Sequence, residues 1–278
     1  HWDHAGGNKE LVQTLTERGV EGVQVFGGVG DGIPCVTQEL ADKDSFTLGE
    51  SSSIAVTALH TPCHTPGHLL FHCTVAGAAQ QASAESTSAA AAGGGAGSEG
   101  SSDGRSPFSI SLTRDVAPGA GGSDVPFFLM DEEQVAARGI VFTGDTLFVG
   151  GCGRFNKGTP AQMYTALVEV IGAMPPDTLL AVGHEYTVAN FAFGAAVEPG
   201  NADIAAKAAW AKEQVCAGVP TVPSTVAQEL ATNVFMRLQA PEVVAFAAKA
   251  GAQLPSDEVQ AQVEVLHRLR KSKNAFRG

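Results

Sequence analysis

The sequence is poor in basic residues, and it lacks a long apolar run. Lysine and arginine number 17 against 29 aspartate and glutamate residues, so the formal net charge is -12. A broad basic face for nucleic acid is therefore not expected, and an anionic ligand would need a local group of cations. No stretch of about eighteen consecutive apolar residues occurs, so we expect no membrane-spanning segment.

Cysteine is also scarce, and its spacing matches no structural site. The chain has 5 cysteines, an odd number, and no two of them stand in a CxxC spacing. This argues against a disulfide framework and a structural zinc ribbon, and makes a reducing compartment the default expectation. With 278 residues, of which 44% are hydrophobic, the chain is long enough to bury a core in one large domain or two smaller ones.

Short strands are predicted in the first part of the chain. Asn8 is expected to cap a helix that ends near Gly19. After it come brief runs of Val, Ile, Phe and Thr separated by Gly, Pro and Ser, a pattern typical of a sheet built from short strands. The predicted strands cover 22–26, 45–48, 53–59 and 68–75.

A segment of low complexity interrupts this pattern from Ala76 to Asp124. It consists largely of alanine, glycine and serine. Such a composition has too little apolar bulk to offset the entropy lost on ordering. We interpret the segment 76–124 as a disordered insertion in a surface loop, either an inert spacer or a partner-binding segment.

Two apolar strands follow the insertion, and each leads to a residue able to bind a metal. The run 140–142 leads to Asp145, and the run 179–182 leads to His184. Between them Thr159 is expected to cap a covering helix whose first turn contains a proline.

Helical segments dominate after about Thr187. Asn201 and Ser256 are expected to cap two of them. The strand signal fades there, so we predict a separate helical domain. The predicted helices cover 201–217, 224–236, 240–250 and 256–272.

Imidazoles and carboxylates recur beside the turns of this sequence. Nitrogen and oxygen donors without matching thiolates suit zinc, iron or manganese in a catalytic site. Taken singly, such residues are more typical of a solvated surface, and it is their clustering that favours a metal site. The candidate ligands are His1, Asp3, His4, His64, Asp145 and His184.

Six motifs occur along the chain in the order HWDHAGGN, TPCHTPGH, FTGDTLFVGGCGRF, GHEYTVANFAF, VEPGN and AWAKE. Together they closely resemble the hydroxyacylglutathione hydrolases, or glyoxalase II enzymes, of the metallo-β-lactamase superfamily. The resemblance implies an α+β fold, with an αββα sandwich over 1–186 followed by an all-helical, glutathione-binding domain over 187–278. It implies hydrolysis of S-D-lactoylglutathione and related glutathione thioesters to a 2-hydroxy acid and glutathione, a reaction of methylglyoxal detoxification.

The resemblance also implies two divalent metal ions, with zinc expected and iron or manganese as alternatives. Their bound water becomes hydroxide near neutral pH and attacks the thioester carbonyl, whose developing charge a metal stabilises. By resemblance, the catalytic residues are Asp3, His4 and Asp145. It places His1 and His64 on one metal, Asp3, His4 and His184 on the other, and Asp145 between the two.

The substrate offers two carboxylates, so its pocket needs cations despite the acidic chain. The C-terminal Arg-x-x-Lys pair of the family matches Arg270 and Lys273, which lie on one helical face. On residues alone, this pair is more typical of a solvated terminal helix, and the resemblance reverses that order. The resemblance adds Arg154 and Tyr186 as glutathione contacts, and Asn156 stands where many relatives have tyrosine.

The family pattern THxHxDH is only partly present, because the sequence begins at its second histidine. One metal would then lack a ligand, and we expect an incomplete gene model or a fragment, inactive or poorly folded as it stands. Evolved loss of activity is the alternative. The compartment stays open between cytoplasm, mitochondrion and plastid. A monomer is expected.

Two other functions compete with thioester hydrolysis. One is a mononuclear iron persulfide dioxygenase of the same superfamily, which also acts on glutathione derivatives. The other is a non-catalytic relative that binds glutathione. The VEPGN segment, the helical domain and the Arg270–Lys273 pair favour the hydrolase, whereas metal content and oxygen dependence separate the three. His68 is expected to give a supporting hydrogen bond at most.

Overall fold

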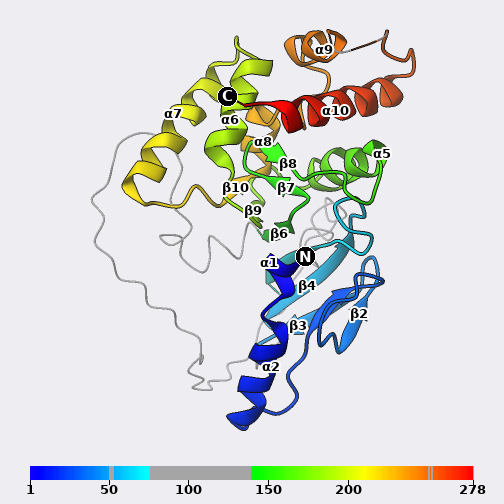
Figure 1. The fold of residues 1–278 in the computed structure, drawn as a ribbon, viewed down its shortest axis with the longest axis vertical. Helices are drawn as coiled ribbons and strands as arrows, with labels where there is room; N and C mark the ends of the chain where they lie inside the picture. The colour runs from blue at the N-terminus through cyan, green and yellow to red at the C-terminus, as the bar shows by residue number, and fades with distance from the viewer. Residues whose placement is uncertain (50–52, 76–138, 250, 252, 278) are drawn as a thin grey trace, which may run out of the picture.

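The computed structural model describes residues 1–49, 53–75, 139–249, 251 and 253–277 (Figure 1). The described residues form one large mixed sheet, two short strand pairs and a group of helices. The insertion predicted at 76–124 lies outside the described residues.

The large sheet has six strands in the order β10-β9-β6-β5-β4-β3. Neighbouring strands run antiparallel, except that β6 and β9 are parallel. Because β6 and β9 are parallel neighbours, the chain leaves both strands at the same edge of the sheet. Ligands typically bind at such edges. The strands are β3 (Ser45–Leu48), β4 (Ile54–His60), β5 (Leu69–Val75), β6 (Ile140–Gly144), β9 (Leu179–Val182) and β10 (Ser224–Thr225).

A short parallel pair packs on one face of this sheet. It consists of β1 (Phe26–Gly28) and β2 (Gln38–Leu40). Phe26 stacks on Phe46 of β3 with ring centroids 4.3 Å apart, and Leu40 lies in a small core with buried residues of the sheet. The resemblance predicts a sandwich of two sheets. Among the described residues, the pair of β1 and β2 takes the place of the second sheet.

Helices lie at both ends of the molecule (Figure 1). Those after residue 186 gather at one end of the molecule, and α2 extends along the opposite end. In the described part of the chain, no helix is both long and apolar enough to traverse a membrane. The helices are α1 (Trp2–Ala5), α2 (Asn8–Glu17), α5 (Pro160–Tyr164), its π-helical continuation η2 (Thr165–Ile171), α6 (Thr187–Val197), α7 (Ala202–Ala217), α8 (Val226–Thr232), α9 (Pro241–Ala248) and α10 (Glu258–Ala275).

One large core joins the sheet to the C-terminal helices. It contains fully buried aliphatic and aromatic side chains from β5, β6, β9, η2, α6 and α10. Each such side chain contributes roughly 1.5–3 kcal/mol relative to its exposed state. Its members include Leu70, Val141, Leu167, Ile171, Leu180, Phe191, Phe193, Leu266 and Leu269.

The α+β class and the helical C-terminal region are confirmed. Thr159 caps α5 as predicted, in a capping box with Gln162, and Asn201 caps α7 through its side-chain oxygen. Both signals are local, because the cap bonds to backbone groups two or three residues ahead.

Two predicted caps are wrong. The N-cap of α2 is Gly7, and the Asn8 amide donates instead to the Pro34 carbonyl at 3.1 Å. The N-cap of α10 is Asp257 rather than Ser256, and its carboxylate accepts the Gln260 N–H at 2.9 Å. A carboxylate is the stronger acceptor for a helix N-terminus, so the helix starts one residue later.

Several predicted boundaries also moved. The first strand begins only at Phe26, and β2 and α6 had no counterpart in the sequence prediction. The predicted helix 224–236 shortens to α8, because Ser224 and Thr225 pair with Leu180 and Leu179 of β9. The C-terminal segment therefore adds an edge strand to the sheet.

Candidate metal centre and substrate site

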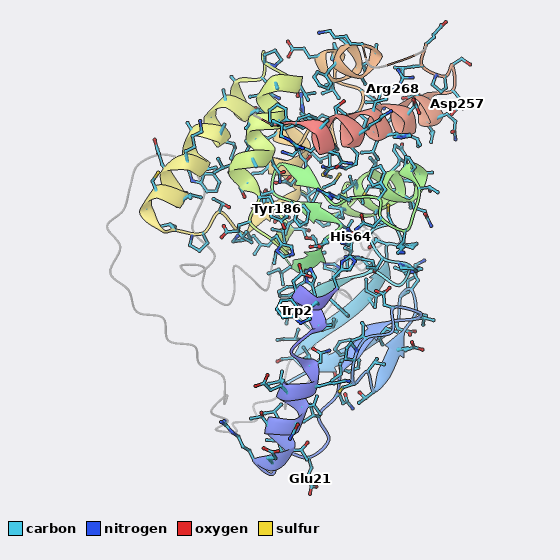
Figure 2. All side chains as sticks on the ribbon, in the orientation of Figure 1. Trp2, Glu21, His64, Tyr186, Asp257 and Arg268 are labelled. Carbon is cyan, nitrogen blue, oxygen red and sulfur yellow. The ribbon has the colours of Figure 1, made fainter. Side chains whose placement is uncertain are left out.

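Separated segments bring ligand-type side chains to one edge of the large sheet. Asp145 follows β6 and His184 follows β9, the two parallel neighbours, while His64 lies in the loop between β4 and β5. Figure 2 shows His64 and Tyr186 in the middle of the molecule, where the sheet meets the helical end, with Trp2 of α1 nearby. Helix α1 and the residue before it supply His1, Asp3 and His4.

These side chains form two groups of three. The possible ligand atoms in each group all lie within 4.8 Å of one another. Three protein ligands with an open position are typical of a catalytic rather than a structural metal site. One group is His1, His64 and Asp145, and the other is Asp3, His4 and His184.

Asp145, a member of the first group, also lies close to the second. Its Oδ2 is 3.2 Å from the Nε2 atoms of both His64 and His4, and its Oδ1 is 3.6 Å from His184 Nε2. Burial opposes ionisation of this carboxyl, but its hydrogen bond with His64 and the nearby imidazoles outweigh that effect and lower its pKa. The Asp145 carboxylate is thus held charged and close to histidines of both groups.

His64 is oriented by a hydrogen bond on its far side. Its Nδ1 donates to the Arg154 carbonyl at 3.1 Å, which directs Nε2 toward Asp145. The hydrogen bond with Asp145 raises the pKa of His64, although burial works against it. Asn156, an exposed residue, places its amide nitrogen 3.5 Å from the same Nδ1 atom.

The nitrogen atoms within the groups converge in a way that suits cations. His64 Nε2 lies 3.1 Å from His1 Nδ1, and His184 Nε2 lies 3.3 Å from His4 Nε2. Among the described residues, Asp145 Oδ1 is buried and has no hydrogen-bond partner. A buried carboxylate oxygen without a partner is costly. Imidazole nitrogens and a carboxylate oxygen that converge in this way are suitable ligands for divalent metal ions.

A fifth histidine, His68, lies behind Asp145 rather than in either group. Its Nε2 is 3.2 Å from the Asp145 backbone nitrogen, and its Nδ1 is 3.1 Å from the hydroxyls of both Thr61 and Thr146. Burial lowers the pKa of His68 to about 4. The ring is therefore neutral and serves as a hydrogen-bonding group.

The thiols beside the site do not act as nucleophiles. Cys63 and Cys152 are 1% and 2% exposed. Burial raises their pKa values to about 12 and about 11, so both remain protonated near neutral pH. They pack in the large core, as small apolar residues do.

The basic pair predicted to bind substrate lies on α10 and faces α6 and the short hairpin over residues 147–152. Arg270 Nη1 donates to the Cys152 carbonyl at 2.7 Å, and Lys273 Nζ donates to the Ala189 carbonyl. Among the described residues, the buried Arg270 Nε has no hydrogen-bond partner. Burial, followed by the Arg270 charge, lowers the pKa of Lys273 to about 8.

Tyr186 lies against the metal-ligand candidates. Its ring stacks on His184 with centroids 5.2 Å apart and meets Phe148 edge-on at 5.1 Å. Half of Tyr186 is exposed, so the phenol forms part of an accessible wall. Arg154 is exposed on the loop after the short hairpin.

That hairpin is built from β7 (Leu147–Phe148) and β8 (Gly151–Cys152), and the helices hold it through buried polar side chains. Nothing in the sequence pattern predicted a role for these side chains. Asn190 donates to the Val149 carbonyl, Glu229 accepts the Gly150 N–H, and Asn233 donates to the Gly151 carbonyl, each at 3.0 Å. We call Asn190, Glu229 and Asn233 the hairpin anchor.

Comparison with known proteins identifies the family of this chain. The family model for the hydroxyacylglutathione hydrolase C-terminus matches residues 185–276. The cytoplasmic hydroxyacylglutathione hydrolase of Arabidopsis thaliana is 34% identical over 278 residues, which are 100% of this chain and 79% of that protein. The chain belongs to the hydroxyacylglutathione hydrolase family. The resemblance drawn from the six motifs is confirmed, and the family is one of thioester hydrolases.

A second relative supports the same membership. The hydroxyacylglutathione hydrolase-like protein of Gallus gallus is 33% identical over 277 residues, covering 100% of this chain and 71% of its own. Among solved structures, a metallo-β-lactamase from Staphylococcus aureus matches at 17% identity with a TM-score of 0.42, over 91% of this chain and 51% of that one. Family membership rests on the sequence relatives.

The region matched to the hydrolase family model contains part of the candidate site. Tyr186, Arg270 and Lys273 lie within residues 185–276, and so do all members of the hairpin anchor. The candidate metal ligands lie before this region, and His184 stands directly beside it.

Proposed function

We propose that this chain hydrolyses glutathione thioesters of 2-hydroxy acids, with S-D-lactoylglutathione as the reference substrate. The observation that carries the proposal is the pair of three-residue groups that meet at Asp145, beside the stacked Tyr186. The reaction would contribute to methylglyoxal detoxification, as expected from the family.

We propose two divalent metal ions, with zinc as the expected metal. Such ions supply an acidified water and an electrophile for a carbonyl oxygen. His1 and His64 would hold one ion, Asp3, His4 and His184 the other, and the Asp145 carboxylate would contact both. The hydrogen bond from His64 Nδ1 to Arg154 leaves Nε2 as that ring's ligand atom.

Asp3 is suited to orient the attacking water. Its side chain is 51% exposed, and its Oδ2 lies 3.3 Å from His184 Nε2. An ionised carboxylate in this place accepts a hydrogen bond from water and directs its oxygen toward the thioester carbon. Water adds to the thioester carbon and loses a proton to solvent, the carbon–sulfur bond then breaks, and the glutathione thiolate takes up a proton from solvent, which gives the 2-hydroxy acid and glutathione.

Cations on two elements would hold the carboxylates of the tripeptide. Arg270 and Lys273 lie on the same face of α10, and Arg154 is exposed on the loop after β8. Tyr186 and Asn156 would line the path between these cations and the metal-ligand groups.

The direct test is hydrolysis of S-D-lactoylglutathione by the 278-residue chain supplied with zinc, with D-lactate, free glutathione and bound metal measured together. Asp145→Asn and His64→Ala should abolish turnover and reduce bound metal. His267→Ala is the matched control, because that histidine is 53% exposed on α10 and should leave turnover unchanged. Bound metal without thioester cleavage, both in this chain and in a version in which the THxHxDH pattern is complete, would refute the proposal. Oxygen consumption with glutathione persulfide would indicate the dioxygenase instead, and bound glutathione without bound metal would indicate the non-catalytic relative.

A further inference from the structure

We propose that His68 is a positioning residue that fixes where Asp145 lies, through a neutral imidazole protonated on Nδ1. The part of the inference that concerns metal affinity rests on the proposed function. The hydrogen bonds themselves belong to the chain without metal.

The first step concerns the Nε2 atom of His68. His68 lies directly before β5 and is 9% exposed. Its Nε2 is 3.2 Å from the Asp145 backbone nitrogen. A backbone N–H can only donate, so Nε2 must carry the lone pair. The ring proton of the neutral imidazole then lies on Nδ1.

The second step concerns the partners of Nδ1. The Thr61 and Thr146 hydroxyls each lie 3.1 Å from this atom, and they are 3.4 Å from one another. These threonines are 2% and 0% exposed, so water does not compete for the N–H. A hydroxyl accepts and donates at once, so both can join one connected network. The Thr61 backbone N–H also donates to the His68 carbonyl at 2.9 Å.

The third step is steric. Gly144, which precedes Asp145, has φ of +48°, and a Cβ atom there would lie 2.8 Å from His68 Nε2. The imidazole therefore packs against the backbone at the end of β6. Glycine is required both for this approach and for the left-handed conformation. The ring and the turn fit only in this arrangement.

The fourth step links this network to both ligand groups. Asp145 Oδ2 lies 3.2 Å from Nε2 atoms of His64 and His4, one in each group. A shift of the Asp145 backbone would move this oxygen away from both histidines. Residues that hold metal ligands from behind typically affect metal affinity about 10–100-fold.

The test compares two polar replacements of different reach. In His68→Gln, the side-chain oxygen reaches the Asp145 N–H and can replace Nε2. In His68→Asn, the shorter amide can replace only Nδ1, so Asp145 loses its acceptor. His72→Asn is the matched control, because His72 lies farther along the same strand β5.

Two measurements are made on the metal-free protein. Nitrogen-15 NMR should show His68 protonated on Nδ1 and bare on Nε2. Amide exchange at Asp145 should be slow in the wild type and in His68→Gln, and faster in His68→Asn. A ring protonated on Nε2, or unchanged exchange in His68→Asn, overturns the inference.

Cobalt binding gives the third measurement. The cobalt dissociation constant should rise about 10–100-fold in His68→Asn, with an altered visible spectrum, and stay near the wild-type value in His68→Gln and His72→Asn. Wild-type cobalt affinity in His68→Asn overturns the inference. A wild-type chain that binds no cobalt overturns the proposed function, and the measurements on metal-free protein then decide the role of His68 alone.

Discussion

The buried carboxylate of Glu229 allows a quantitative test of how the helices hold the hairpin between β7 and β8. Glu229 is 1% exposed. Its Oε2 accepts the Gly150 N–H at 3.0 Å and the Asn233 amide at 2.8 Å, and its Oε1 accepts the Ser224 hydroxyl at 2.6 Å. Two substitutions separate the loss of these acceptors from the loss of charge: Glu229→Ala and Glu229→Gln.

In Glu229→Ala the Gly150 N–H and one N–H of the Asn233 amide lose their acceptor, while the Ser224 hydroxyl can donate to the Gln228 side-chain oxygen at 3.3 Å. Each unsatisfied donor costs about 1–3 kcal/mol, so the free energy of unfolding should fall by at least about 2 kcal/mol. Total stability is typically about 5–15 kcal/mol, so this loss is a large fraction of it. In Glu229→Gln the amide oxygen can accept from Gly150 and Asn233, while its NH₂ group donates to Ser224. The expected loss is therefore about 1 kcal/mol or less.

The pH dependence has a defined sign. Burial raises the pKa of Glu229 above the ordinary value for a glutamate, although its hydrogen bonds oppose the shift. The folded state thus favours the protonated form. The stabilisation from this group is fully present below the unfolded pKa and is lost as pH rises through the folded pKa. Relative to Glu229→Gln, which does not titrate there, wild-type stability should decline over that interval.

The assay is urea unfolding followed by circular dichroism. Unfolding midpoints are compared between proteins whose free energy of unfolding falls with urea concentration at the same slope. His267→Ala serves as a surface control, since it lies on the exposed side of α10. If Glu229→Ala unfolds within about 0.5 kcal/mol of wild type, the range of ordinary surface substitutions, the hairpin does not depend on this carboxylate. A difference from Glu229→Gln that is constant with pH would refute the assignment of the raised pKa.

Three further substitutions test other parts of the structure. Thr159→Ala removes the capping box with Gln162 and should cost about 1 kcal/mol in thermal or urea unfolding, whereas an unchanged midpoint would contradict the cap. Gly153→Ala should abolish metal binding, measured by titration calorimetry, because a Cβ atom at this position would lie 1.8 Å from the Asp145 carbonyl oxygen. Retained metal affinity would show that the loop adapts. For Lys273, whose pKa is lowered to about 8, the charge is lost as pH rises through that value, so KM for the thioester should increase there. Lys273→Arg should abolish that increase, and the same pH profile in both proteins would place the titration elsewhere.

The candidate ligands could be predicted because their signals are local. Asp145 and His184 each follow a short apolar strand, and parallel pairing of β6 with β9 brings them to one edge. Thr159 and Asn201 were found as caps for the same reason, since their partners lie within three residues. For each of these residues, the neighbouring few positions in the sequence were enough to indicate its role.

Long-range partners explain what the sequence did not reveal. Glu229 bonds to Gly150 across 79 positions, and an acid within a helix gives no sign that it will be buried. Asn8 resembled a cap, but its amide bonds to Pro34 across 26 positions. Strand β10 contains 2 residues, too few for any alternation of polar and apolar side chains to be seen.

The pairing of β10 with β9 affects how the molecule unfolds. Ser224 lies opposite Leu180 and Thr225 opposite Leu179, so residues beyond the metal-ligand segments protect the backbone of the strand that leads to His184. Opening of the C-terminal helices would expose that strand to solvent. Hydrogen exchange at Leu180 should therefore follow the exchange of α8, whereas the Leu179 N–H donates to the Gly139 carbonyl at 3.1 Å, on the β6 side. The region matched by the family model should then unfold as one cooperative unit with the sheet.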